Sequence, residues 1–183
     1  MKDCEKGLNG KWSRMALGNK KWGGGDSNVI AHISRQLRPG YIWVTSGATE
    51  IGRIDYIRRA GCELKGAYTD VKSDYAAQGQ AILMESYRRY VDPQYGLRQI
   101  LVEHQHVNDD AKAESLKKLL LRCPAQKAIP IVNYNDPLSN EEIVKTELQV
   151  LMQRKKHVVH CADNDETAAQ IACPVKCRNL WIY

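Results

Sequence analysis

Short apolar runs alternate along the chain with longer stretches in which apolar positions recur every three or four residues. The short runs are rich in β-branched and aromatic residues and predict strands, at residues 12–18, 41–45, 97–103, 128–135 and 179–183. The stretches between them have helical spacing and predict helices after residues 26 and 47 and at about 73–91, 110–122, 140–153 and 164–173. This alternation predicts an α/β fold with a mainly parallel sheet sandwiched by helices.

The apolar positions also predict which helix faces are buried. Two helices have one clearly apolar face, formed by Val29, Ile30, Ile33 and Leu37 in the first and by Leu116, Leu119 and Leu120 in the second. The helix at 73–91 carries instead the run "AAQGQ" at 76–80, whose small residues permit close packing. We therefore expect another element to lie very near this helix.

Polar residues follow four of the expected strands and turns. The segments are "ALGN" (16–19), "VTSGA" (44–48), "VNYND" (132–136) and "CADND" (161–165). Turn and capping chemistry would explain any one of them. Since ligands of parallel sheets bind beyond the carboxyl ends of the strands, four such segments at one edge predict a small-molecule site.

Composition and charge narrow the class of protein. The chain has 183 residues and a net charge of +6, but its basic residues are dispersed in short groups. No nucleic-acid-binding signature is visible, so we expect no nucleic-acid partner. No apolar run approaches the ~20 residues that cross a membrane, and the polar start at residues 1–11 does not resemble a signal peptide. We expect a cytoplasmic protein without a membrane partner.

The cysteines and histidines do not form a metal-binding pattern. The six cysteines lack paired CxxC spacing, and reduced thiols are the expectation without a secretion signal. The segments "EHQH" (103–106) and "HVVH" (157–160) offer imidazoles, but spacing places no third or fourth ligand beside them. We expect no metal site.

Four segments, in this order along the chain, resemble motifs of the amino acid kinase family. "VTSGA" (44–48) is similar to its second-strand motif, "AAQGQ" (76–80) to A-A-V-G-Q, "IPIVNYND" (129–136) to V-P-V-I-N-E-N-D, and "DND" (163–165) to G-D-N-D. The resemblance covers about residues 12–183 and is greatest to the branch that phosphorylates the side-chain carboxylate of glutamate in proline biosynthesis. It implies the carbamate kinase-like fold, ATP and Mg²⁺ as cofactors, and glutamate or a similar amino acid as ligand.

The resemblance also implies roles for individual residues. The substrate-binding set would be Ser46, Gly47, Ala48, Asn133, Asp136 and Asn164. Ser46 and the backbone N–H groups after it would donate to a substrate carboxylate, while Asp136 and Asn164 would hold the amino-acid end. Asp165 corresponds to the catalytic acidic residue near the transferring phosphoryl group. Helix capping and first-turn charge are the simpler explanation of an isolated "DND".

The family's first strand ends in K-L-G, whose lysine stabilises the phosphoryl group. Two alignments of this chain are possible. If "ALG" (16–18) takes that place, Ala16 stands where the lysine is expected; if "KWG" (21–23) takes it, Lys21 is the catalytic residue. The first alignment is favoured because the second would put Gly18 and Asn19 inside a buried strand, where both residue types are disfavoured.

The turn after this strand is the expected phosphate loop. It contains Gly18, Asn19 and Lys20, and the long flexible stems of Lys20 and Lys21 could still reach phosphates. A missing preorganised charge commonly costs about 100- to 1000-fold in rate.

The resemblance divides the chain into a polar extension at 1–11 and a kinase-like domain at 12–183, with an insertion at about 144–162. In the family the strand that resembles "NLWIY" (179–183) precedes the nucleotide-binding half, so this chain is expected to contain only the substrate half. ATP binding and catalysis are therefore expected to be impaired in this chain alone.

Three functions remain open at this point. The chain could be a kinase completed by a partner, a non-catalytic amino-acid-binding or regulatory subunit, or an assembly module. Because exposed edge strands and apolar surfaces are seldom left bare, we expect a homo-oligomer or a partner chain.

Overall fold

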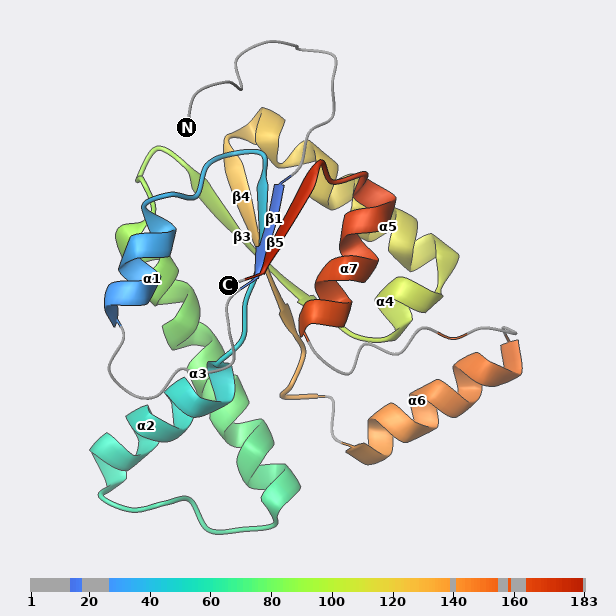
Figure 1. Ribbon diagram of the computed structural model, residues 1–183. Coiled ribbons are helices and arrows are strands. Elements are labelled where there is room, and N and C mark those ends of the chain that lie inside the picture. The colour runs from blue at the N-terminus through green and yellow to red at the C-terminus, as the bar shows by residue number, and fades with distance from the viewer. Residues whose placement is uncertain (1–13, 18–26, 139–140, 155–157, 159–163, 183) are drawn as a thin grey trace.

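Five strands form one parallel sheet in the computed structural model, which describes residues 14–17, 27–138, 141–154, 158 and 164–182 (Figure 1). The strands are β1 (Arg14–Leu17), β2 (Tyr41–Val44), β3 (Gly96–Val102), β4 (Ala128–Tyr134) and β5 (Asn179–Ile182). Their order across the sheet is β3-β4-β2-β1-β5, and every neighbouring pair is parallel. The predicted α/β fold with a mainly parallel sheet is confirmed.

Helices connect the strands in the predicted sequence of elements. They are α1 (Ser27–Ser34), α2 (Ala48–Ala60), α3 (Tyr68–Tyr90), α4 (Gln105–Asn108), α5 (Asp110–Arg122), α6 (Glu141–Arg154) and α7 (Asn164–Val175), with a 3₁₀ turn at Pro124–Gln126. Two details differ from the prediction: α3 begins at Tyr68 and not near residue 73, and the short α4 was not expected. Even α3, the longest described helix, is too polar to cross a bilayer, and the other described helices do not meet the requirement either.

The sheet separates two apolar clusters. Helices α1 and α3 lie against one face, and α5 and α7 lie against the other (Figure 1). Strand β2 serves both clusters because successive side chains point to opposite faces: Trp43 belongs to the α1/α3 cluster, whereas Ile42 and Val44 belong to the α5/α7 cluster. Val29 was predicted on the buried face of α1, but its side chain is 40% exposed, so that prediction was wrong.

Helices α2 and α3 cross with almost no side chain between them. A Cβ atom added to Gly79 would lie 1.7 Å from the carbonyl oxygen of Ala48, and one added to Gly52 would lie 1.9 Å from that of Tyr75. Real Cβ contacts do not approach this distance, so each position requires glycine on steric grounds. The close approach expected from "AAQGQ" is therefore present, and its partner is the start of α2.

Replacing Gly79 with alanine should destabilise the fold, even though alanine is the better helix former. The new methyl group would have to push the backbone of α2 away, and overpacking of this kind typically costs about 1–3 kcal/mol. Urea unfolding of Gly79→Ala would measure the loss. Gly96→Ala is the matched control, because its Cβ would meet nothing nearer than Ala128 Cβ at 3.7 Å. Equal unfolding midpoints for Gly79→Ala and the unmodified chain would contradict the close crossing.

Candidate functional site

The carboxyl ends of β2 and β4 bring several of the predicted residues together. Val44 pairs with Val132, and the backbone N–H of Thr45 donates to the Val132 carbonyl at 2.9 Å. Ser46 therefore follows β2, and Asp136 follows β4, at the same edge of the sheet. Helix α3 covers the same edge, and α7 begins there (Figure 1). We call this region the carboxyl edge of the sheet.

The turn after β2 presents hydrogen-bond donors at this edge. Gly47 has φ +96°, in the left-handed region that glycine tolerates, and it precedes the first residue of α2. The first N–H groups of a helix have no partner within the helix and attract anions. The Ser46 Oγ atom is buried and has no hydrogen-bond partner among the described residues. This turn can therefore bind a carboxylate.

Asn133, predicted to lie close to the substrate, contacts helix α3. Its Nδ2 donates to Gln80 Oε1 at 2.9 Å, and its Oδ1 accepts from the backbone N–H of Tyr134 at 2.9 Å. Asn133 is 2% exposed and Gln80 is 6% exposed. The Asn133 amide thus orients Gln80, and the Gln80 Nε2 atom has no partner among the described residues. The sequence singled out residues 76–80 as a packing segment and as one of the resembling motifs, but it assigned no ligand contact to Gln80.

Asp136 supplies a negative charge at the same edge. Burial raises the pKa of its carboxyl group, and the positive charge of Lys72 on α3 offsets this only in part. A carboxylate that is costly to ionise when unpaired is suited to accept a ligand ammonium group, because the ligand would restore the missing charge.

Asn164 and Asp165 form the first turn of α7. Asp165 is exposed and Asn164 is partly buried. A carboxylate in this position interacts favourably with the helix dipole, so its presence alone does not require a catalytic role. The predicted phosphate-loop residues Gly18, Asn19 and Lys20 and the catalytic candidate Lys21 lie outside the described residues, as does residue 163.

A chain of hydrogen bonds supports the site from within the core. Trp43 Nε1 donates to Tyr87 Oη at 2.7 Å, Tyr87 Oη lies 2.6 Å from Thr45 Oγ1, and Thr45 Oγ1 donates to the Ser46 carbonyl at 3.3 Å. Because Thr45 donates onward, the Tyr87 hydroxyl donates to Thr45. Burial raises the pKa of Tyr87 to about 12, so this hydroxyl keeps its proton. The chain connects α3 to the backbone of Ser46.

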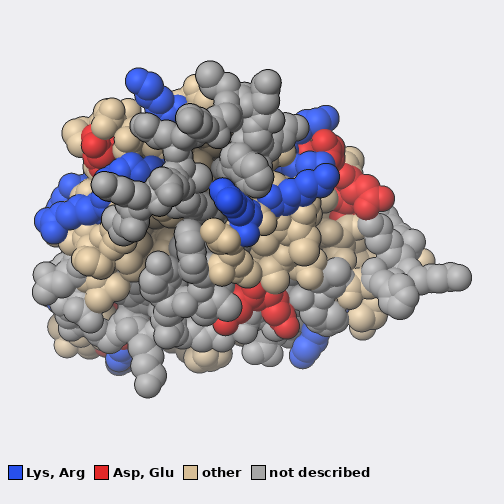
Figure 2. All heavy atoms as spheres, turned by 45° about the horizontal axis from the view of Figure 1, so that its top comes forward, with Lys and Arg blue, Asp and Glu red and all other residues tan. Residues whose placement is uncertain are grey.

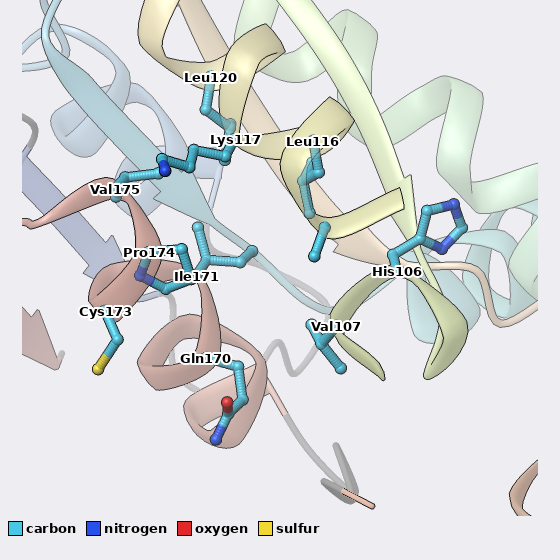
Figure 3. A pocket seen from close by; sticks show the side chains of 11 residues that line it. His106, Val107, Leu116, Lys117, Leu120, Gln170, Ile171, Cys173, Pro174 and Val175 are labelled. Carbon is cyan, nitrogen blue, oxygen red and sulfur yellow. The ribbon is translucent and has the colours of Figure 1, made fainter. Parts of the chain in front are cut away.

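A cavity of about 160 Å³ lies elsewhere, between α4, α5 and α7 (Figure 3). Leu116, Leu120 and Ile171 are among its lining residues, whereas the His106 ring and the Cys173 sulfur point away from it (Figure 3). The cavity belongs to the α5/α7 side of the sheet and includes none of the predicted site residues.

The face shown in Figure 2 has no single dominant patch of charge among the described residues. Among the described residues, Lys and Arg side chains form separate groups with Asp and Glu between them on the face shown in Figure 2. In the described part of the chain, no group of three or more His, Cys, Asp and Glu side chains is placed to hold a metal ion.

Comparison with known proteins supports the family resemblance. A protein named glutamate 5-kinase from Symbiobacterium thermophilum is 31% identical over 137 residues, which are 74% of this chain and 44% of that protein. Another of the same name, from Streptococcus suis, is 30% identical over 158 residues, 82% of this chain and 38% of that protein. The chain thus spans less than half the length of these curated relatives. No family model matches the chain.

Replacing Asp136 with asparagine should stabilise the protein at neutral pH. Because folding raises the pKa of this carboxyl group, its protonated form favours the folded state. This contribution to the free energy of unfolding is complete below the ordinary pKa, about 4, and is lost as the pH rises through the pKa of the folded state. The free energy of unfolding of Asp136→Asn should therefore exceed that of the unmodified chain at pH 7, with a smaller difference near pH 4. Urea titrations at both pH values would measure this. The exposed Asp74→Asn is the control, with an expected change within about 0.5 kcal/mol. A less stable Asp136→Asn at pH 7 would show that a protein group already pairs this carboxylate.

Replacing Tyr87 with phenylalanine should cost about 1–3 kcal/mol, because the buried Trp43 and Thr45 groups would lose their shared partner. Chemical denaturation would give the value, with Tyr68→Phe as the matched control, since Tyr68 is 77% exposed. Indistinguishable losses for the two variants would argue against the hydrogen-bond chain.

Proposed function

We propose that this chain is the amino-acid-binding part of a glutamate 5-kinase-like protein and that it holds glutamate at the carboxyl edge of its sheet. The observation that carries this proposal is the pair of buried, unpartnered polar groups, Ser46 Oγ and Gln80 Nε2, on the edge that also contains the partly buried Asp136. The similarity to proteins named glutamate 5-kinase supports the choice of amino acid.

The groups at this edge match the charges of glutamate. Asp136 would receive the ammonium group, and Asn164 would lie with it at the amino-acid end. Ser46 Oγ and the N–H groups of Gly47 and Ala48 would receive a carboxylate at the positive end of α2, where anions are favoured. Each group of the ligand would satisfy a protein group that is otherwise costly to bury.

In the proposed kinase, ATP with Mg²⁺ would supply the phosphoryl group for the side-chain carboxylate of glutamate. The loop expected to face the nucleotide lies outside the described residues, so we assign it no step. Asp165 remains the proposed organiser of this region, with Lys21 as a candidate for charge neutralisation. Strand β1 ends at Leu17 among the described residues, and Ala16 pairs with Trp43 of β2 and Trp181 of β5. This pairing supports the alignment in which Ala16 takes the place of the family's lysine.

A second candidate is a non-catalytic amino-acid-binding or regulatory subunit. The position of Ala16 in β1 favours it, because alanine cannot stabilise a transferring phosphoryl group. Both candidates include the proposed kinase-like domain at 12–183, the extension at 1–11 and the insertion at 144–162, of which α6 covers a part. We also propose an oligomer or a partner chain, supported by the edge position of β5 and the 38% exposure of Leu180.

Calorimetric titration of the purified chain with L-glutamate tests the proposal. We expect saturable binding, and Ser46→Ala should weaken it about tenfold or more, as for loss of a hydrogen bond to a charged group. Ser115→Ala, at an exposed position of α5, is the matched control and should bind as the unmodified chain does. Absence of any glutamate binding would reject the proposed function.

Titration with Mg-ATP in the presence of glutamate separates the two candidates. Nucleotide binding and turnover by the unmodified chain would favour the kinase. Glutamate binding without turnover, followed by no gain in Ala16→Lys, would favour the non-catalytic subunit.

A further inference from the structure

We infer that Gln80 is a ligand-binding residue that donates a hydrogen bond to a carboxylate oxygen of the bound amino acid. This inference rests on the proposed function, and it adds a residue from α3 to a site otherwise built from strand ends. The residue acts through its Nε2 group alone. Its Oε1 atom is already engaged by the protein.

The position of Gln80 follows from the crossing of α2 and α3. Gly79 lies against the carbonyl oxygen of Ala48, so the next residue of α3 is held at the start of α2. Gln80 also reaches Asn133 near the end of β4, at 2.9 Å. Gln80 therefore lies between the two segments that form the carboxyl edge.

The orientation of the Gln80 amide follows from a backbone group. The N–H of Tyr134 can only donate, so the Asn133 atom 2.9 Å from it must be the carbonyl oxygen Oδ1. Asn133 consequently presents its NH₂ group to Gln80, and Gln80 must present its oxygen in return. The Gln80 NH₂ group is thereby directed away from Asn133, with two donor hydrogens.

Burial makes this donor informative. Gln80 is 6% exposed, and Nε2 has no partner among the described residues. Buried polar groups without a partner are rare in native proteins and call for an explanation. Ser46 Oγ, on the neighbouring turn, is in the same condition.

Two unpartnered groups at one edge indicate the chemistry of the missing partner. Nε2 can only donate, and a hydroxyl can donate as well, so one ligand group with two acceptor oxygens would satisfy both. A carboxylate has this property. An ammonium group would repel the donor hydrogens of Nε2, which leaves Asp136 as the partner for the ammonium group of the ligand.

The variant Gln80→Glu tests the donor, because it keeps an acceptor for Asn133 and removes the NH₂ group. We expect about 10- to 100-fold weaker binding of L-glutamate in calorimetry, the range for a hydrogen bond to a charged group. Gln126→Glu is the matched control: Gln126 is exposed, and Arg98 donates to its Oε1 atom at 3.0 Å.

Nuclear magnetic resonance of the unmodified chain supplies a test that needs no variant to fold. The side-chain NH₂ signals of Gln80, identified by sequential assignment, should shift when L-glutamate is added, and those of Gln126 should stay in place. Glutamate binding with unmoved Gln80 signals, or with equal affinity in Gln80→Glu, would overturn this inference and leave the proposed function standing.

If glutamate does not bind, the proposed function fails, and titration with succinate decides the inference separately. Movement of the Gln80 signals with succinate would support a carboxylate donor in a site for another ligand. Unmoved signals would overturn the inference as well.

Discussion

The contact between the backbones of α2 and α3 determines where the candidate site lies. At Gly79 and Gly52 there is no room for a Cβ atom, so the helices meet backbone against backbone. This contact holds α3 over the ends of β2 and β4, because the residues of α3 that lie one and two helical turns after Gly79 face the sheet. Tyr87 then reaches Trp43 and Thr45, and Gln80 reaches Asn133. A wider crossing would separate both pairs.

The polar groups of the candidate site lower the stability of the fold. An unsatisfied buried donor costs about 1–3 kcal/mol, and burial also raises the pKa of Asp136, which penalises its charged form. A fold is marginally stable, by about 5–15 kcal/mol, so such groups are a substantial fraction of the total. The hydrogen bonds of Tyr87 and Asn133 hold the groups beside Ser46 and Gln80 in place.

The sequence predicted the elements that have a strong local pattern. The strands at 41–45 and 128–135 and the helix at 110–122 were found within a residue or two, because each has a continuous apolar run or a clear apolar face. Helix α4 was missed because four residues are too short for a periodic pattern and one of its contacts is tertiary: His104 Nδ1, just before α4, lies 2.7 Å from Tyr134 Oη. Gln80 was missed as a site residue for a related reason, since its orientation depends on Asn133, which is 53 positions away.

The architecture separates the two ends of the proposed ligand. The amino-acid end would rest on β2, β4 and α3, whose contacts with one another do not involve β1. The phosphoryl end would depend on β1 and the loop after it, where we propose that Ala16 takes the place of the family's lysine. The residues of β1 donate and accept none of the side-chain hydrogen bonds described above for Thr45, Gln80 and Asn133. If the proposed function holds, amino-acid binding and phosphoryl transfer depend on different strands, so the two properties have to be measured separately.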